Sequence, residues 1–183
     1  MKHALIIGGT GMLFDVSGWL AEQEDCRLSI VGRKAAPINS LIDILDDKTK
    51  ITPLLVDYTN HTAFWEKLEW TIQQNGPIDL VVAWVHSIGK NALNIVKDEL
   101  SESGQKWRLF HITGSSSDLS KIKKELTIPP NCSYHQIQLG FIVENSASRW
   151  LTHKEISAGV IDAIQNNWQR KIVGVVEPWE KRP

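Results

Sequence analysis

Short apolar runs alternate along the chain with longer segments in which apolar residues recur every three or four positions. Runs of four to eight apolar residues between turn signals are typical of strands buried in a parallel sheet, and the longer spacing is typical of helices with one buried face. The runs predict strands at residues 4–7, 27–31, 51–56, 78–85, 109–113, 134–139 and 171–176. The amphipathic segments predict helices at 12–23, between Asn60 and Asn75, and at 91–100, 118–126 and 153–168. One more helix is predicted after the second strand, with Pro37 as its first residue. Such alternation requires crossover connections, so we expect an α/β fold: a doubly wound, mainly parallel Rossmann-type sheet of about seven strands between two helical layers.

Composition narrows the class of protein. The chain has 183 residues, is 42% hydrophobic and carries a net charge of −1. We predict one domain over residues 1–177 and a flexible polar tail at 178–183. The near-neutral charge argues against a nucleic-acid partner, and no apolar run reaches the roughly 20 residues of a membrane helix.

Cysteine and tryptophan usage add further expectations. Cys26 and Cys132 show neither a metal-ligand nor a CxxC spacing, and no signal peptide is recognisable. We therefore expect reduced thiols, a cytoplasmic protein and no metal site. Most of the eight tryptophans are expected in the core or in pocket walls.

A glycine-rich turn joins the first predicted strand to the first predicted helix. Gly8 permits a tight turn, and Gly11 allows the backbone to approach a pyrophosphate because no Cβ stands in the way. The first helical amides present free N–H groups and the positive end of the helix dipole to the phosphates. An ordinary strand–helix turn is the alternative. We predict that a nicotinamide dinucleotide is held here by Gly8, Gly9, Thr10, Gly11, Met12 and Leu13.

The turn resembles the GxxGxxG fingerprint of the short-chain dehydrogenase/reductase superfamily, in its extended and atypical branches. Gly8 and Gly11 match its first two glycines, and Phe14 replaces the third, which implies a wider or rotated helix unless Gly18 restores close approach. Residues 138–145 resemble the stretch after the sixth strand in atypical members, and this resemblance makes Gly140 a candidate cofactor contact. The final helix is expected to begin with a capping box formed by Thr152 and Glu155.

The resemblance also assigns the adenosine half of the cofactor. Arg33 and Lys34 stand where NAD-preferring members carry an acidic residue, and two cations suit a 2′-phosphate. This favours NADP over NAD, with two solvated loop residues as the alternative. Asp57, with Tyr58 beside it, falls where members contact adenine, and a turn or N-cap role is equally compatible. Ala83 and Trp84 end the fourth strand beside the cofactor, with a bulky residue in place of a small one.

The usual catalytic pair of the superfamily, a Tyr and a Lys four positions apart on one helix face, is absent. The two tyrosines, Tyr58 and Tyr134, are followed four residues later by Thr and Gln. His86, after the fourth strand, is the candidate proton donor, and Ser115, after the fifth, the candidate donor to a substrate carbonyl. A loop residue and a helix N-cap are the respective alternatives. His111, inside the fifth strand, is expected to be structural.

Two functions from different classes follow. One is an NADP-dependent oxidoreductase of atypical mechanism that acts on an unknown small carbonyl or alcohol substrate. The other is a non-catalytic dinucleotide-binding sensor or regulatory protein, which the missing pair favours. A structural domain that has lost the cofactor is a weaker third option. Relatives often dimerise through the helices after the fourth and fifth strands, so a homodimer is possible, although the second of these helices is short here.

Overall fold

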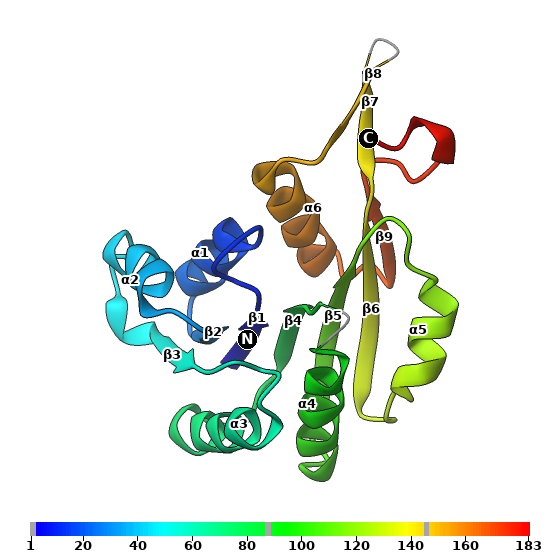
Figure 1. The fold of residues 1–183 in the computed structure, drawn as a ribbon. Helices are drawn as coiled ribbons and strands as arrows, with labels where there is room; N and C mark the ends of the chain where they lie inside the picture. Colours follow the sequence, from blue (N-terminus) through cyan, green and yellow to red (C-terminus); the bar gives the residue numbers. More distant parts are fainter. Residues whose placement is uncertain (1–2, 87–88, 145–146) are drawn as a thin grey trace.

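A seven-stranded parallel sheet forms the centre of the computed structural model, which describes residues 3–86, 89–144 and 147–183 (Figure 1). The strand order is β3-β2-β1-β4-β5-β6-β9. The strands are β1 (His3–Ile7), β2 (Arg27–Gly32), β3 (Ile51–Leu55), β4 (Leu80–Trp84), β5 (Trp107–Thr113), β6 (Cys132–Leu139) and β9 (Arg170–Val173). The doubly wound α/β class is confirmed. The order reverses between β1 and β4, and ligands of such sheets bind at this switch point, beyond the carboxyl ends of the strands.

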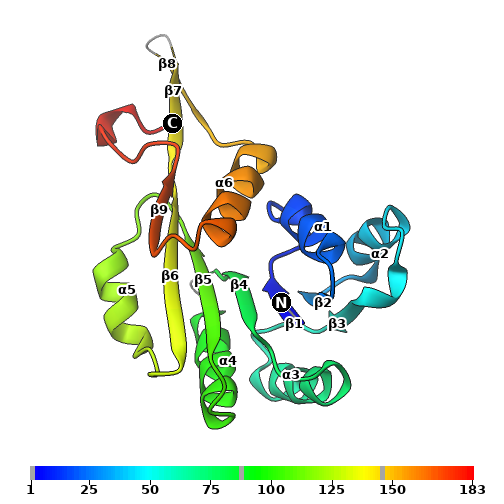
Figure 2. The same cartoon turned by 180° about the vertical axis from the view of Figure 1, so that it is seen from behind.

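Helices cover both faces of the sheet (Figures 1 and 2). One layer contains α1 (Phe14–Glu22), α2 (Ala35–Asp43) and α6 (His153–Gln165), and the other contains α3 (His61–Asn75), α4 (Lys90–Glu102) and α5 (Leu119–Leu126). The described ranges also contain two short 3₁₀ helices, η1 (Lys48–Lys50) and η3 (Trp179–Lys181). None of the helices in the described ranges is both long and apolar enough to cross a membrane.

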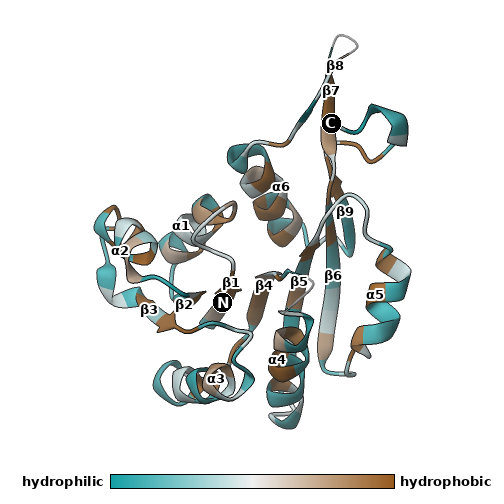
Figure 3. Ribbon diagram, in the orientation of Figure 1, coloured by the Kyte–Doolittle hydropathy of each residue, from teal (hydrophilic) through white to brown (hydrophobic). Residues whose placement is uncertain are grey.

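Alternation along the strands builds a core on each side of the sheet. In β1, Ile6 packs with the α1 and α6 side chains, whereas Leu5 and Ile7 pack with Phe64 and other residues of the α3–α4 layer. Successive side chains of a strand point to opposite faces, so a strand covered on both sides must be apolar throughout. Figure 3 shows the consequence: β4 is strongly hydrophobic, whereas α5 is largely hydrophilic.

A hairpin beyond β6 was not predicted. β7 (Phe141–Glu144) and β8 (Ala147–Trp150) form a separate antiparallel pair that projects past the sheet (Figure 1). Arg149 holds it to α6, because its guanidinium donates to both Glu155 oxygens at 2.9 Å and to Glu144 Oε1 at 3.1 Å. Strands of four residues give little periodicity, so the sequence alone does not predict them.

Three local expectations change or gain detail. Pro37 is the third residue of α2 and not the first, because Lys34 is the N-cap, and the missing N–H is tolerated within the first turn. The last strand ends at Val173, earlier than predicted, because Gly174 adopts a φ of +76°. The capping box is confirmed: Thr152 Oγ1 accepts from Glu155 N at 3.2 Å, and Thr152 N donates to Glu155 Oε2 at 2.8 Å.

The expectation for the tryptophans was wrong. Five of the eight are 43–52% exposed: Trp65, Trp70, Trp150, Trp168 and Trp179. A count of large side chains does not say on which face of an element they lie, and an indole tolerates partial exposure because its N–H is polar. In the segment 178–183, for which flexibility stays a prediction, Arg182 lies between the rings of Trp150 and Trp179, 5.1 and 4.7 Å from their centroids.

Candidate functional site

The glycine turn is tight on its inner side and open on its outer side. Gly8 has a φ of +87°, and a Cβ there would lie 3.0 Å from the Trp84 carbonyl oxygen. A Cβ on Gly9 would lie 2.5 Å from Ser17 Oγ, which donates to the Gly9 carbonyl at 2.9 Å. A Cβ on Gly11 would meet nothing within 4 Å. The turn therefore packs on β4 and α1 and leaves Gly11 accessible to a ligand.

The structure also shows what replaces the third fingerprint glycine. Close approach of α1 to the turn occurs at Gly9 and Ser17, so Phe14 does not have to fit between helix and strand. Gly18 does not restore that approach as expected, because it faces α2, where a Cβ would lie 3.7 Å from Leu41. Phe14 instead lines a cavity of about 410 Å³ between the turn and α6. The cavity is lined by Thr10, Gly11, Met12, Phe14, Asp15, His153, Lys154 and Ser157.

Basic and acidic candidates gather at the carboxyl ends of β2 and β3. Arg33 and Lys34 are exposed, and neither forms an ion pair with any residue that the structure describes. Asp57 accepts hydrogen bonds from Thr59 N at 2.9 Å and Thr59 Oγ1 at 2.7 Å, and these bonds lower the pKa of Asp57. Asp57 thus stabilises the turn after β3, and its carboxylate remains exposed. Tyr58 is half-buried, and its ring packs directly on Gly89, before α4.

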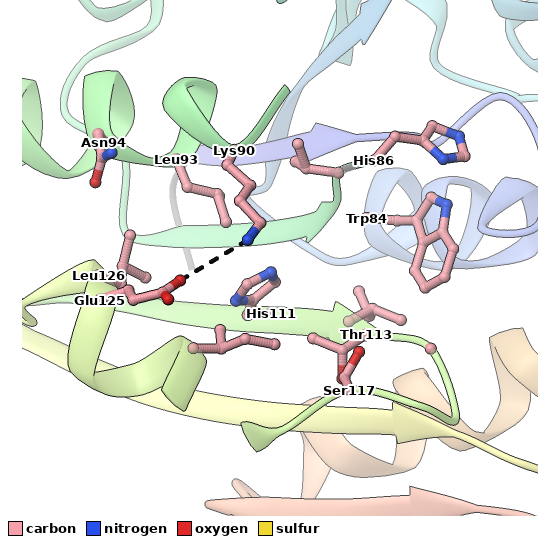
Figure 4. Close-up of a pocket in the computed structure, with 14 residues that line it drawn as sticks. Trp84, His86, Lys90, Leu93, Asn94, His111, Thr113, Ser117, Glu125 and Leu126 are labelled. Carbon is pink, nitrogen blue, oxygen red and sulfur yellow. Dashed lines mark ion pairs between the residues drawn. The ribbon is translucent and has the colours of Figure 1, made fainter. Parts of the chain in front are cut away.

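A second cavity, of about 310 Å³, lies at the carboxyl ends of β4 and β5 between α4 and α5 (Figure 4). Its lining residues are Trp84, Val85, His86, Lys90, Leu93, Asn94, His111, Ile112, Thr113, Gly114, Ser117, Ile122, Glu125 and Leu126. Trp84 also contacts Gly8, so this cavity, the β4–β5 pocket, adjoins the glycine turn. The exposed His86 stands edge-on to Trp84, with ring centroids 6.1 Å apart and planes at 76°.

The buried His111 and the half-buried Tyr134 form a pair that sequence reasoning did not bring together. His111 Nδ1 lies 3.0 Å from the Tyr134 hydroxyl. Burial lowers the pKa of His111 to about 4 and raises the pKa of Tyr134 to about 12. Tyr134 lies near the amino end of β6, away from the ligand edge of the sheet, and its hydroxyl contacts the His111 ring, which lines the pocket. The sequence offered one signal for this pair. Alternate side chains of a strand point to the same face of the sheet, and both residues occupy such positions on neighbouring strands.

The remaining candidates lie apart from the pocket floor. Ser115 is absent from the described lining, and its carbonyl, like that of Ser117, accepts from Gln138 Nε2 at 3.1 Å. Asp118, not a serine, caps α5. The backbone of Gly140 packs against the Val175 carbonyl, where any Cβ would collide. This packing by itself explains why position 140 is a glycine. Position 145 of the resembling segment lies outside the described residues.

Comparisons with known proteins agree with this geometry. No family model matches the chain, and neither does any curated protein. Among solved structures, it is similar to YwfH, an NADPH-dependent reductase involved in bacilysin biosynthesis, with a TM-score of 0.72 and 14% identity over 95% of this chain and 99% of that one. The chain has the short-chain dehydrogenase/reductase fold. An alcohol dehydrogenase from Thermococcus sibiricus, complexed with 5-hydroxy-NADP, gives a TM-score of 0.69 and 14% identity over 96% of each chain. A short-chain dehydrogenase/reductase from Mycobacterium marinum gives 0.72 and 14% over 94% and 93%. The resemblance seen in the sequence is confirmed for the fold.

The fold is present without the usual catalytic pair. The helix between β5 and β6, α5, has eight residues and contains no tyrosine. Tyr58 lies in the loop after β3, and Tyr134 lies in β6. Any proton chemistry at this edge of the sheet must therefore use other groups.

Proposed function

We propose that the protein belongs to the short-chain dehydrogenase/reductase superfamily, binds NADP(H), and acts as an atypical oxidoreductase on a small carbonyl or alcohol substrate. The observation that carries the proposal is an open glycine turn at the switch point of the sheet. Arg33 and Lys34, at the end of β2, agree with it, because neither forms an ion pair with any residue that the structure describes. A neighbouring pocket of about 310 Å³ is large enough for a small substrate.

The described residues fit a dinucleotide. The turn from Gly8 to Leu13 would hold the pyrophosphate, and Leu13, the N-cap of α1, supplies no side-chain hydrogen bond that would compete for the first helical amides. Arg33 and Lys34 would bind the 2′-phosphate, and Asp57 with Tyr58 would border the adenosine. Ala83 and Trp84 would form the wall toward the nicotinamide half. NADPH and NADP in the names of two similar structures support this choice of cofactor.

When bound, the cofactor supplies or accepts a hydride. The residues of this chain must then exclude water, orient the substrate and handle the proton. Trp84, which separates the turn from the β4–β5 pocket, would exclude water. His86 and Ser115 remain the proposed proton donor and carbonyl ligand; His86 lines the pocket, whereas Ser115 lies outside its described lining.

Titration of the protein with NADPH and with NADH, followed by nucleotide fluorescence, tests the cofactor. We expect NADPH to bind more tightly, and Arg33→Ala to weaken NADPH about tenfold or more while leaving NADH nearly unchanged, because charge-assisted hydrogen bonds contribute about 1.5–3 kcal/mol. Arg27→Ala is the matched control, since Arg27 is an exposed arginine at the opposite end of the same strand. Equal binding of both nucleotides would refute the role of Arg33, and binding of neither would refute the cofactor.

A non-catalytic sensor or regulatory protein is the second candidate. The observation that favours it is the eight-residue α5, which lacks the usual pair. The two functions can be separated by mixing the protein and NADPH with a panel of aldehydes, ketones and quinones. Oxidation of NADPH is then followed by the loss of its absorbance. Tight NADPH binding without turnover on any compound favours the sensor. Cytoplasmic location and a homodimer through α4 and α5 also remain proposals.

A further inference from the structure

The floor of the β4–β5 pocket carries one buried polar ring among apolar side chains. His111 is 8% exposed and lines the cavity with Leu93, Ile112, Ile122 and Leu126. Figure 4 shows its ring beside the Lys90–Glu125 ion pair that spans the pocket. An imidazole placed among apolar groups costs free energy unless its nitrogens are hydrogen-bonded, so the partners of each nitrogen matter.

One imidazole nitrogen has a partner and the other does not. Nδ1 lies 3.0 Å from the Tyr134 hydroxyl. Nε2 has no hydrogen-bond partner among the residues that the structure describes, and it is not sealed from solvent as the unpartnered Trp107 Nε1 is. Nε2 is therefore the polar atom that His111 leaves available to the contents of the pocket.

The Tyr134 hydroxyl decides which tautomer His111 adopts. His111 Nδ1 is the hydrogen-bond partner that the structure gives the Tyr134 hydroxyl. The phenolic proton stays on Tyr134, because burial raises the pKa of this hydroxyl to about 12. It points to Nδ1, because a neutral imidazole nitrogen accepts from a hydroxyl and the described part of the chain offers this proton no other acceptor. His111 then carries its own proton on Nε2. Burial keeps the ring neutral at physiological pH, since the pKa of His111 falls to about 4.

The pocket lies level with the glycine turn. Ala83 pairs with both Ile7 of β1 and His111 of β5 in the strand registers. His111 is thus level with the residue before Gly8 and two strands away, a lateral distance of about 10 Å. A ligand on the pocket floor would sit next to Trp84, on the side of the sheet edge assigned above to the nicotinamide.

The charged side chains around the pocket lie at its rim and not on its floor. Lys90 Nζ lies 3.8 Å from Glu125 Oε2, and Lys121 Nζ lies 4.0 Å from Glu125 Oε1. All three side chains are substantially exposed at the rim. Thr113 Oγ1, on the floor, donates at 3.4 Å to the Ile137 carbonyl. As far as the structure describes the pocket, its floor therefore offers an N–H donor and apolar surface and carries neither a cation nor an anion.

We propose that this pocket binds a small, uncharged, mainly apolar carbonyl compound whose oxygen accepts a hydrogen bond from Nε2–H of His111. His111 is then a substrate-binding residue that polarises the carbonyl and keeps its own proton, and Tyr134 is a positioning residue that fixes the tautomer. Identification of this ligand as the oxidoreductase substrate rests on the proposed function. Binding to the pocket itself does not require the dinucleotide.

Long-range ¹H–¹⁵N spectra of the histidine side chains test the tautomer in the full chain without cofactor. We expect His111 to show the Nε2–H form without titration between pH 8 and 6, and Tyr134→Phe to produce a mixture of tautomers. Acetophenone should shift the Nε2 resonance, and ethylbenzene, which lacks the carbonyl, should not. A predominant Nδ1–H form, or an Nε2 resonance unaffected by acetophenone, would overturn the proposal.

Binding constants provide the second measurement, by titration followed through ligand-detected NMR. Acetophenone should bind about three- to tenfold more tightly than ethylbenzene, as a neutral hydrogen bond allows. His111→Phe should abolish that preference, His111→Gln should keep part of it through its amide N–H, and His61→Gln, an exposed control on α3, should not alter it. Equal binding of the two probes to the unmodified chain, or tighter binding of benzoate than of acetophenone, would refute the ligand class. Because no nucleotide is present, these outcomes are independent of failure in the NADPH titration.

Discussion

His111 makes the stability of the fold depend on pH in a direction that can be calculated. In the unfolded chain an imidazole titrates near pH 6.5, whereas in the folded protein burial lowers the pKa of His111 to about 4. Between these values only the unfolded chain takes up the proton, so acid stabilises the unfolded state. His111 therefore adds no penalty above pH 6.5, and the folded state loses stability progressively as the pH falls from 6.5 toward 4.

The magnitude follows from linkage. The full difference corresponds to about 3 kcal/mol of unfolding free energy, of which about 2 kcal/mol is lost between pH 7 and pH 5. Burial also lowers the pKa of His3 and of His135, so the unmodified protein loses more than this in total. A comparison with His111→Gln isolates the contribution of one residue.

Urea denaturation at pH 7, 6 and 5 measures the effect. We expect the unfolding free energy of His111→Gln to fall by about 2 kcal/mol less than that of the unmodified protein over this range. His61→Gln, which removes an exposed histidine, serves as the control and should follow the unmodified protein. Parallel curves for His111→Gln and the unmodified protein would show that His111 titrates as an exposed imidazole, and the reasoning from burial would then be wrong.

Three further substitutions test the elements around the glycine turn and α6. Gly8→Ala should lower the unfolding free energy by at least about 1–2 kcal/mol, because a φ of +87° strains an L-residue and the Cβ would press on the Trp84 carbonyl. Gly11→Ala should fold normally and weaken NADPH binding, since its Cβ would enter open space where the pyrophosphate is proposed; similar thermal denaturation midpoints for the two variants would contradict this difference. Thr152→Ala should destabilise the protein by about 1 kcal/mol through loss of the α6 capping box, measurable by urea denaturation, with the exposed Thr62→Ala on α3 as control. An unchanged midpoint for Thr152→Ala would mean that the capping box contributes little.

The fold class and the glycine turn could be predicted from the sequence because both depend on local order. An apolar run such as that of β4 must be buried on both faces, and its alternation with amphipathic helices leads to a parallel sheet. Gly8 and Gly11 lie in one short segment, so their spacing is visible without the fold. The missing Tyr–Lys pair is a property of the sequence alone, since the chain has two tyrosines and neither has a lysine four positions later.

Features that join distant segments could not be predicted in this way. The His111–Tyr134 hydrogen bond depends on the β5–β6 register, which places Leu109 opposite Tyr134 and His111 opposite Gln136. The packing of Gly140 against the backbone of Val175 appears only when the chain after β9 returns to the sheet.

The sequence by itself determined that this chain is a Rossmann-type α/β protein with a dinucleotide-type turn and without the common catalytic pair. Only the tertiary structure decided which polar groups line its pocket, because burial and hydrogen-bond partners depend on which strands and helices pack together. His111 illustrates the difference: its place in a strand could be predicted from the sequence. Its neutral ring, its partner and its access to the cavity come from β6 and from the space between α4 and α5.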